Sequence, residues 1–572
     1  MTTARSTPLA RGRLASSLNS LVVVVVAALV ASFALAARPS SPPSVAEFAP
    51  QAAQQIDEAP EELAGTTGGG VAVGPESEEP ADGEDSDGDG LGADASEGEG
   101  SGQGTGKPVG VPSSLACVTW PDGSVTQTFD PQSPPCVASW PDAADGNGGA
   151  TARGVTETEI RVAVRYFSAD AWEALADFFN THYQLYGRRI TIVHAGFGAH
   201  SDPAGQAAQA QETADLGVFA SLDYNYYYTQ DEFADQVTDL GVMYIRAAVT
   251  GNYERNTLAV AKPGLLWTYF PDYELRARET GRFVCAALAG RPPQFGGPGI
   301  GEPGGDRRFA VLYPEFPDGR ASPDLAPLTA ELDRCGAPYV TRAYPESMRF
   351  NFGADTPEGP QIMAQLRAEG VTSILPVTGA NAEWFGLWHS ADRVQFQPEW
   401  VLNGRLPGLT DNWRSFVPPS QMAHVFGPTE EPRTVPIGAT PAAQALAEVG
   451  IDAQRQDLIF FEESGYGAMQ LLAAGIQQAG PELTVDTFRA GLQATRFSNP
   501  GVQAPPYFQQ GISFSPSDYS EVDDFAIRWW SATGTDVQDG ASGTWCWWDG
   551  GARYAGAGWP ADFSFRPGAP CP

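Results

Sequence analysis

The sequence has few basic residues for its length. It holds 34 lysines and arginines against 69 aspartates and glutamates in 572 residues, which gives a formal net charge of −35 at pH 7. Proteins that bind nucleic acid or anionic lipid present a basic face to their partner. The composition therefore argues against both partners and suits a soluble extracellular protein.

The sequence also lacks the usual patterns of metal and catalytic sites. None of the six cysteines forms a C-x-x-C pair, and the five histidines have no partner at ligand spacing. No G-x-S-x-G motif occurs. Residues 299–304 spell G-x-G-x-x-G, but they follow a predicted helix and precede a strand, which reverses the phosphate-binding order. We expect no metal site, no cofactor and no enzymatic activity.

One long apolar run lies near the N-terminus. Residues 1–20 carry only arginines as charged residues, and residues 21–37 carry no charge. A helix over residues 21–37 would span about 26 Å, slightly less than the ~30 Å core of a bilayer. The run fits either a cleaved signal peptide or a signal-anchor helix in the membrane. In both cases residues 1–20 start on the cytoplasmic side. The rest is either anchored at the extracellular face of the cell membrane or secreted.

The next region has almost no large apolar residues. Residues 38–112 consist mainly of Pro, Gly, Ser, Ala, Asp and Glu. Such a stretch cannot bury enough surface to offset the entropy of ordering it. We predict a disordered acidic linker, followed by a small cysteine-containing segment over residues 113–150.

An even number of cysteines in an exported chain predicts disulfides. Sequence proximity favours three local pairs, which are Cys117 with Cys136, Cys285 with Cys335, and Cys546 with Cys571. The alternative is that one or more of these cysteines stay reduced and buried.

From Glu159 onward, strand-like and helix-like segments alternate. The apolar run IRVAVRYF precedes ADAWEALADFFNTHYQLYG, whose apolar residues recur at helical spacing, and RRITIVHAG follows as a strand. The alternation continues as far as EWVLNG at 399–404. It predicts parallel sheets with helices on both faces. About nine strands exceed what one sheet usually carries, so two α/β lobes are expected.

Several of these segments, in their order, carry a family resemblance. GVTETEIRVAV, YGRRITIV, GVMYIRAA and LLWTYFPDYELRARETGRFVC resemble the type I periplasmic solute-binding proteins, the receptors of ABC importers typified by branched-chain amino acid binders. The resemblance covers about residues 154–530 and implies two doubly wound parallel-sheet lobes with a cleft between them. Within residues 154–572, it implies a first lobe at about 154–270 and 410–505 and a second at about 271–409 and 506–572.

Ligands of open parallel sheets bind beyond the carboxyl ends of the strands. The residues at the predicted strand ends, with one at the start of a returning helix, are the candidate ligand contacts. They are Tyr166, Ser221, Asp223, Tyr224, Tyr226, Glu315, Thr378, Asn403 and Tyr466. Amino-acid binders of the resembling family hold the ligand carboxylate with hydroxyls and backbone N–H groups after the third strand, where Ser221 and Thr229 could serve in this sequence. The tyrosines that follow could stack on an aromatic or sugar-like solute, and Asp223 could pair with an ammonium group.

The resemblance predicts an extracellular receptor that captures a small polar or amphipathic solute between its lobes. The expected solute is an amino acid, an amide or an aromatic acid, and the expected protein partner is an ABC permease. The membrane is a further partner if residues 21–37 are not cleaved. The alternative is a membrane-tethered ligand sensor or envelope interaction module with the same fold and no role in transport.

Overall fold

The computed structural model describes most of the chain from Cys117 onward. The described residues are 117–140, 146–165, 169–196, 202–223, 231–246, 256–301, 305–315, 323–345, 348, 357–377, 381–404, 414, 417–452, 461–500, 510–567 and 571. The predicted cytoplasmic segment, apolar run and linker over residues 1–112 lie outside them. None of the helices in the described ranges is long and apolar enough to cross a bilayer.

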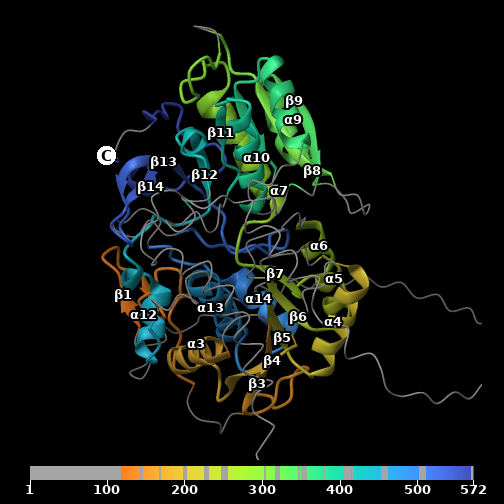
Figure 1. Cartoon of the computed structure of the whole chain (residues 1–572). Helices are drawn as coiled ribbons and strands as arrows, with labels where there is room; N and C mark the ends of the chain where they lie inside the picture. Colours follow the sequence, from red (N-terminus) through yellow and green to blue (C-terminus); the bar gives the residue numbers. More distant parts are fainter. Residues whose placement is uncertain are drawn as a thin grey trace, which may run out of the picture.

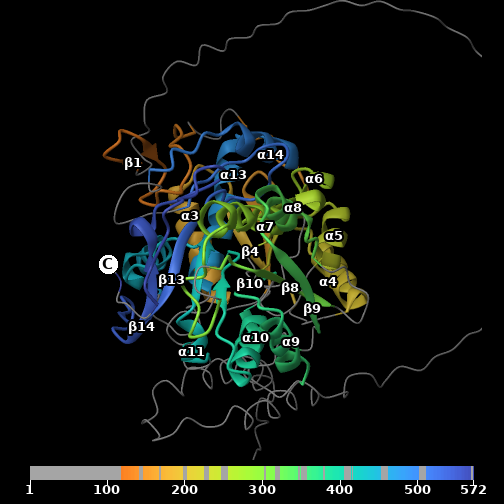
Figure 2. The same cartoon turned by 90° about the horizontal axis from the view of Figure 1, so that it is seen from above.

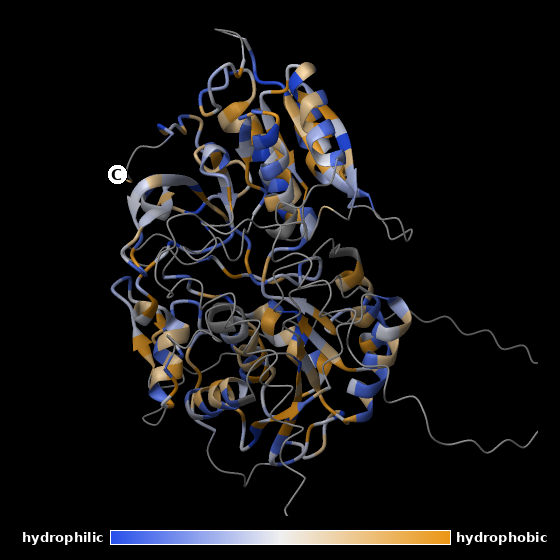
Figure 3. Ribbon diagram, viewed as in Figure 1, coloured by the Kyte–Doolittle hydropathy of each residue, from blue (hydrophilic) through white to orange (hydrophobic). Residues whose placement is uncertain are grey.

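Two separate sheets with helices around them form the two lobes of the molecule (Figure 1). Lobe one is built on an all-parallel sheet. Its strands, in spatial order, are β4 (Arg189–His194), β3 (Glu159–Arg165), β5 (Ala220–Asp223), β6 (Met243–Arg246) and β7 (Leu266–Thr268). β6 and β7 are buried along their whole length because both faces of the sheet are covered there. The edge strand β4 instead exposes Arg189 and Thr191, and Figure 3 colours the apolar strand residues orange.

Helices cover both faces of the lobe-one sheet. They are α3 (Ala169–His182), α4 (Pro203–Asp215), α5 (Asp231–Asp239), α6 (Asn256–Ala261), α12 (Pro441–Glu448), α13 (Phe461–Ala479) and α14 (Val485–Ala494). α4 packs on α5 on one side, and α3 packs on α13 on the other (Figure 2). Local sequence fixes their starts: the Asp202 carboxylate accepts from the Gly205 amide at 2.8 Å, and Thr484 and Thr487 form a capping box on α14.

The cysteine-containing segment packs onto lobe one. Its hairpin of β1 (Val118–Thr119) and β2 (Val125–Thr126) is closed by the Cys117–Cys136 disulfide. Phe129 packs edge-on against Phe178 of α3 with 6.0 Å between ring centroids.

Lobe two is built on a mixed sheet. Its strands, in spatial order, are β14 (Ser542–Trp547), β13 (Ala526–Thr535), β12 (Val425–Thr429), β11 (Glu399–Val401), β10 (Ser373–Pro376), β8 (Phe309–Glu315) and β9 (Tyr339–Pro345). β12 to β9 are parallel, and the β13–β14 hairpin is antiparallel. The tryptophans of this hairpin are largely buried, as expected for a tail that packs on lobe two.

The helical elements of lobe two include one π-helical segment and several short turns. They are α7 (Tyr273–Phe283), the π-helical η3 (Val284–Leu288), α8 (Ala326–Cys335), α9 (Glu358–Ala368), α10 (Asn381–Arg393), α11 (Pro419–Met422), the turn η6 (Ile437–Ala439) that leads back to lobe one, and η8 (Trp548–Gly551). Side chains of β8 alternate between two cores, one with α7 and α8 and one with α9 and α10. The parallel α/β architecture expected from the sequence is therefore present in both lobes.

The lobe boundaries differ from the expected ones in two places. β12 lies in the lobe-two sheet between β11 and β13, although residues from about 410 were expected in lobe one. The stretch VFGPT contains Gly427 and Pro428, which indicate a turn, yet all five residues are buried in the sheet. The chain also leaves lobe one later than expected, because Ile512, Phe514 and Tyr519 belong to the lobe-one core.

All three predicted disulfides are present. Cys285–Cys335 joins the π-helical end of α7 to the end of α8, and Cys546–Cys571 ties the C-terminus to β14. No cysteine of the described residues is free.

Candidate functional site

The strand order places one topological switch point in each lobe. In lobe one, β4 lies on one side of β3 while β5, β6 and β7 extend on the other. In lobe two, β9 lies on one side of β8 while β10, β11 and β12 extend on the other. Ligands of doubly wound sheets bind beyond the carboxyl ends of the two strands that flank this point. The candidate site therefore lies at the ends of β3 and β5 and at the ends of β8 and β10.

The last residues of three lobe-one strands form a charged row. Arg165 of β3 pairs with Asp223 of β5, and Asp223 pairs with Arg246 of β6. Residues paired across a parallel ladder point to the same face, and neighbouring strands are about 4.8 Å apart. Two arginines thus flank one aspartate position at the carboxyl edge of the sheet.

The Arg165 side chain is held under α4 and α5. It is only 3% exposed, and its guanidinium carbon lies 4.1 Å from the centroid of the Phe233 ring in the first turn of α5. Its Nη2 donates to Oε1 of Gln209 on α4. Both of these partners are uncharged. Within the part of the chain that the structure describes, the buried Nη1 of Arg165 has no hydrogen-bond partner.

Two further polar groups lie at the same edge and on the same face. Ser221 of β5 is two residues before Asp223 and fully buried, and its Oγ has no partner among the described residues. The backbone N–H of Phe233, near the N-terminus of α5, donates to Oε1 of Gln206 at 3.3 Å. Buried polar groups are normally satisfied. The guanidinium and the hydroxyl can each donate a hydrogen bond to a polar group, whereas α5 begins with Asp231 and Glu232 and adds negative charge at its N-terminus.

At the corresponding edge of lobe two, Glu315 ends β8 and is exposed. Asn403 follows β11 and is half-buried. Within the described residues, neither side chain forms a hydrogen bond to a group in lobe one. The strand order places Glu315 at the lobe-two switch point, at the end of β8, and Asn403 beyond the end of β11, the strand next to β10.

Tyr466 of α13 lies in a different part of lobe one. It is buried in the core on the α3 side of the sheet, and its ring centroid is 5.4 Å from that of Phe179. Burial, together with the nearby carboxylate of Asp130, raises the pKa of its hydroxyl well above the usual value. Arg165 contacts α4 and α5 instead, so the structure does not bring Tyr466 together with Arg165 and Ser221.

The remaining predicted contacts cannot be placed as side chains. Tyr166, Tyr224, Tyr226 and Thr378 lie outside the described residues, and for Asp223 only the strand position is described. The residues that sequence reasoning missed are the two arginines and the two glutamines Gln206 and Gln209. A signal for the arginines exists, because each ends a run of apolar strand residues, in IRVAVR and MYIR.

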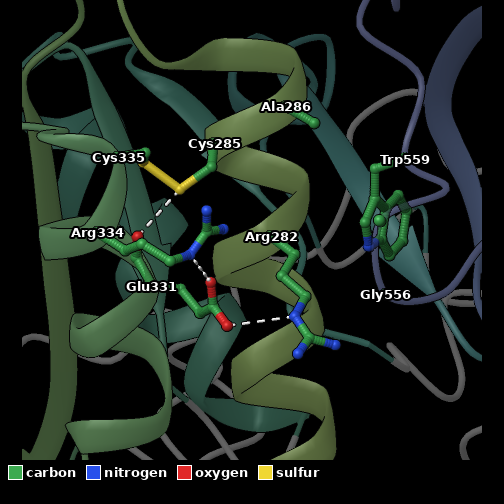
Figure 4. Close-up of a pocket in the computed structure, with 9 residues that line it drawn as sticks. Arg282, Cys285, Ala286, Glu331, Arg334, Cys335, Gly556 and Trp559 are labelled. Carbon is green, nitrogen blue, oxygen red and sulfur yellow. Dashed lines mark hydrogen bonds and ion pairs between the residues drawn. A yellow bond between two sulfur atoms is a disulfide. The ribbon is translucent and has the colours of Figure 1, made fainter.

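A separate pocket lies on the helical side of lobe two, between α7, α8 and the C-terminal segment (Figure 4). It measures about 560 Å³, and the Cys285–Cys335 disulfide, Arg282, Glu331 and Trp559 are among its lining residues. Glu331 accepts from Arg282 at 3.2 Å and from Arg334 at 2.7 Å. The charged groups of this pocket are thus paired with each other, and it is formed by helices rather than by strand ends.

Comparisons with known proteins find similarity in structure alone. No family model matches the chain. No curated protein matches it by sequence. The structure is similar to solved ABC transporter substrate-binding proteins.

Three of these structures illustrate the similarity. A substrate-binding protein from Aeropyrum pernix is 15% identical with a TM-score of 0.47, over 68% of this chain and 94% of that one. A leucine-, isoleucine-, valine-, threonine- and alanine-binding protein from Brucella ovis is 12% identical with a TM-score of 0.47, over 70% and 96%. A solute-binding protein from Rhodopseudomonas palustris in complex with p-hydroxybenzoic acid is 11% identical with a TM-score of 0.46, over 68% and 97%. The fold assignment itself rests on the strand order, which is the same for the parallel strands of both lobes.

Proposed function

We propose that this chain is an extracellular solute-binding receptor, which captures a small polar or amphipathic solute between its lobes and delivers it to an ABC importer. The observation that carries the proposal is the buried polar set at the lobe-one switch point. Arg165 and Ser221 lie on the two strands where a doubly wound sheet binds its ligand, and each has a buried polar atom without a partner among the described residues.

The arrangement of two separate lobes supports a receptor whose lobes move relative to each other. Each lobe has a core of its own. The chain crosses between the lobes three times: first between Thr268 and Tyr273, second between Thr429 and Pro441, and third between Tyr519 and Ala526. Bilobed proteins of this kind close on a ligand by hinge motion at such crossings. Three disulfides support the exported location.

A ligand screen by thermal shift tests the proposal. The purified chain is melted in the presence of amino acids, amides, aromatic acids and sugars. A solute present at 100 times its Kd adds about 2.7 kcal/mol to the apparent stability, so we expect one solute class to raise the melting temperature. If none of the solutes does so, the receptor proposal fails and the tethered interaction module becomes the better description.

Delivery to an importer needs a second measurement. The loaded receptor is added to vesicles that contain a candidate ABC permease from the same organism, and uptake of labelled solute is followed. Solute binding without stimulated uptake would favour the ligand sensor over the transport receptor.

A further inference from the structure

We propose that a single proton, held by Glu521 beside the buried carboxylate of Asp130, keeps residues 117–140 docked on lobe one, and that loss of this proton releases them. The inference concerns the cysteine-containing segment and the third crossing between the lobes. It does not depend on which solute binds or on a role in transport.

The carboxyl group of Asp130 is placed to carry a negative charge. Asp130 belongs to the docked segment and is fully buried. Its Oδ1 accepts from the backbone N–H of Gln132 at 2.9 Å, and its Oδ2 accepts from Nε2 of Gln470 on α13 at 2.8 Å. Hydrogen bonds from N–H donors to both oxygens favour the ionised form of a carboxyl group.

The carboxyl group of Glu521 has the opposite surroundings. Glu521 lies in the third crossing and is 2% exposed, and its buried Oε2 has no hydrogen-bond partner among the described residues. Its backbone N–H donates to the Thr268 carbonyl at 2.9 Å, which holds the residue against lobe one. Ionisation of a buried carboxyl oxygen without donors is unfavourable. The proton of the pair therefore belongs on Glu521.

The groups that surround the pair cannot neutralise a second negative charge. Tyr183, which follows α3, interacts with both Asp130 and Glu521. Tyr466 of α13 interacts with Asp130, and Tyr269 of the first crossing interacts with Tyr466. All three are phenols, which are neutral near pH 7. In the described part of the chain, neither carboxyl group forms an ion pair with a basic side chain.

Burial, and after it the charge of Asp130, raises the pKa of Glu521 well above its usual value. Burial also raises the pKa of Asp130. Other titratable groups on the surrounding elements have partners of their own. They are His182 with Glu448 at 2.6 Å, Asp524 with Arg553 at 2.8 Å, and Asp523 with the Ser513 hydroxyl.

Residues 117–140 also contact lobe one through groups that do not titrate. Nε2 of Gln127 donates to the His182 carbonyl at 2.8 Å, and Nε2 of Gln477 donates to the Pro135 carbonyl at 3.3 Å. The pair at Asp130 thus adds a pH-dependent contact to a neutral one. If both carboxyl groups ionise, two like charges face each other away from water, and release of the segment lets water reach them.

The sign of the pH dependence follows from this arrangement. The docked state binds the proton more tightly than the released state, in which a glutamate has its ordinary pKa of about 4.3. Docking is therefore strongest below about pH 4 and weakens as the pH rises towards the raised pKa of Glu521. Between these limits, release of one proton increases the opening constant of the segment by up to about tenfold per pH unit.

Hydrogen exchange on the full-length chain tests this slope. Exchange of the backbone amides of residues 117–140 is measured by mass spectrometry between about pH 6 and about pH 8, where an ordinary carboxyl group no longer titrates. Rates are corrected for the intrinsic exchange rate at each pH. Amides of β3 in the same samples report the unfolding of lobe one as a whole. We expect the opening constant of the segment to rise with pH more steeply than that of β3.

One variant and two controls assign the slope to Glu521. Glu521→Gln imitates the protonated side chain, and the Oε2 position has no described donor that its NH2 group would meet. Its segment should stay docked, with an opening constant that changes less than about twofold per pH unit. Asp122→Asn, in the exposed turn of the same segment, and His182→Gln, which removes a group that titrates in this range, should both keep the wild-type slope.

The outcomes decide the inference without reference to solute binding. A flat wild-type curve overturns it, whether or not the variants fold. A Glu521→Gln chain that keeps the wild-type slope shows that the proton is not on Glu521. A Glu521→Gln segment that is released at every pH also contradicts the proposal, because an uncharged replacement should remain docked.

Discussion

Substitution of the buried carboxylate of Glu399 is predicted to destabilise lobe two strongly. It is fully buried in β11, and its Oε1 accepts from the backbone amides of Gln294 and Phe295, each at 2.9 Å. Arg307 donates Nε to Oε2 at 2.7 Å and Nη2 to Oε1 at 3.1 Å, and Ser373 donates its hydroxyl to Oε2. One side chain thus ties together β11, β10 and the loop that leads to β8.

Replacing Glu399 by glutamine keeps its shape and removes its charge. One carboxylate oxygen becomes an NH2 group that faces donors, and the Arg307 guanidinium stays buried without an anion. Breaking a buried ion pair from one side costs about 3 to 5 kcal/mol. For a unit of this size, each kcal/mol lowers the melting temperature by about 2 to 4 °C. We therefore expect Glu399→Gln to melt about 6 to 20 °C lower in calorimetry or circular dichroism.

A matched substitution elsewhere in lobe two serves as the control. Glu369 pairs with Arg342 at 2.6 Å, but both side chains are about one-third exposed. Exposed pairs contribute about 0 to 1 kcal/mol, so Glu369→Gln should melt within a few degrees of the wild type. The reasoning about Glu399 is refuted if the two variants lose the same small amount. Adding Arg307→Met to Glu399→Gln should recover part of the loss, because it removes the stranded charge.

Two further predictions concern pH and the disulfide of the lobe-two pocket. Burial, with a smaller contribution from nearby carboxylates, raises the pKa of Asp523 from the usual 3.8 to about 8. The folded chain therefore binds this proton more tightly than the unfolded chain, and stability should fall as pH rises from about 4 to about 8. Urea unfolding across this range should show a shallower fall for Asp523→Asn, and an equal slope would contradict the raised pKa. Replacing Cys285 and Cys335 together by serine should cost about 2 to 4 kcal/mol, measured by the same unfolding curves, with an unchanged midpoint as the contrary result.

The sequence predicted the architecture because the features that define it are local. A run such as IRVAVR followed by helical spacing is sufficient to identify a βα unit, and short chain separations identified the three disulfides. Which of the two sheets a strand joins depends instead on distant parts of the chain. VFGPT joins the lobe-two sheet because β11 and β13 offer it two neighbours, and residues 425–429 carry no sign of those neighbours.

The predicted site residues came from a rule that is also local to each strand. The rule that ligands bind at strand ends selected Ser221 and Asp223 from the sequence. Arg165 was read as part of a strand, since its neighbours are apolar. Its special position depends on Gln209 and Phe233, which are 44 and 68 residues away in the sequence and reach it only after α4 and α5 pack on the sheet.

The crossings between the lobes determine where the molecule can bend. At the lobe-one end, the Thr268 amide donates to the Tyr519 carbonyl at 3.1 Å, and the Glu521 amide donates to the Thr268 carbonyl at 2.9 Å, so the first and third crossings run side by side. At the lobe-two end, Arg553 donates to the carbonyls of residues 430 and 431 and to the carboxylate of Asp524, which joins the second and third crossings.

None of the three disulfides joins lobe one to lobe two, since one lies in the segment packed on lobe one and two lie within lobe two. The crossings are therefore the segments of the described chain that can serve as a hinge between the lobes, and Asp523 lies in the third one. A hinge needs only a few residues that change their backbone dihedrals. Burial raises the pKa of Asp523 to about 8, so the third crossing carries a group that becomes negatively charged as pH rises through that value.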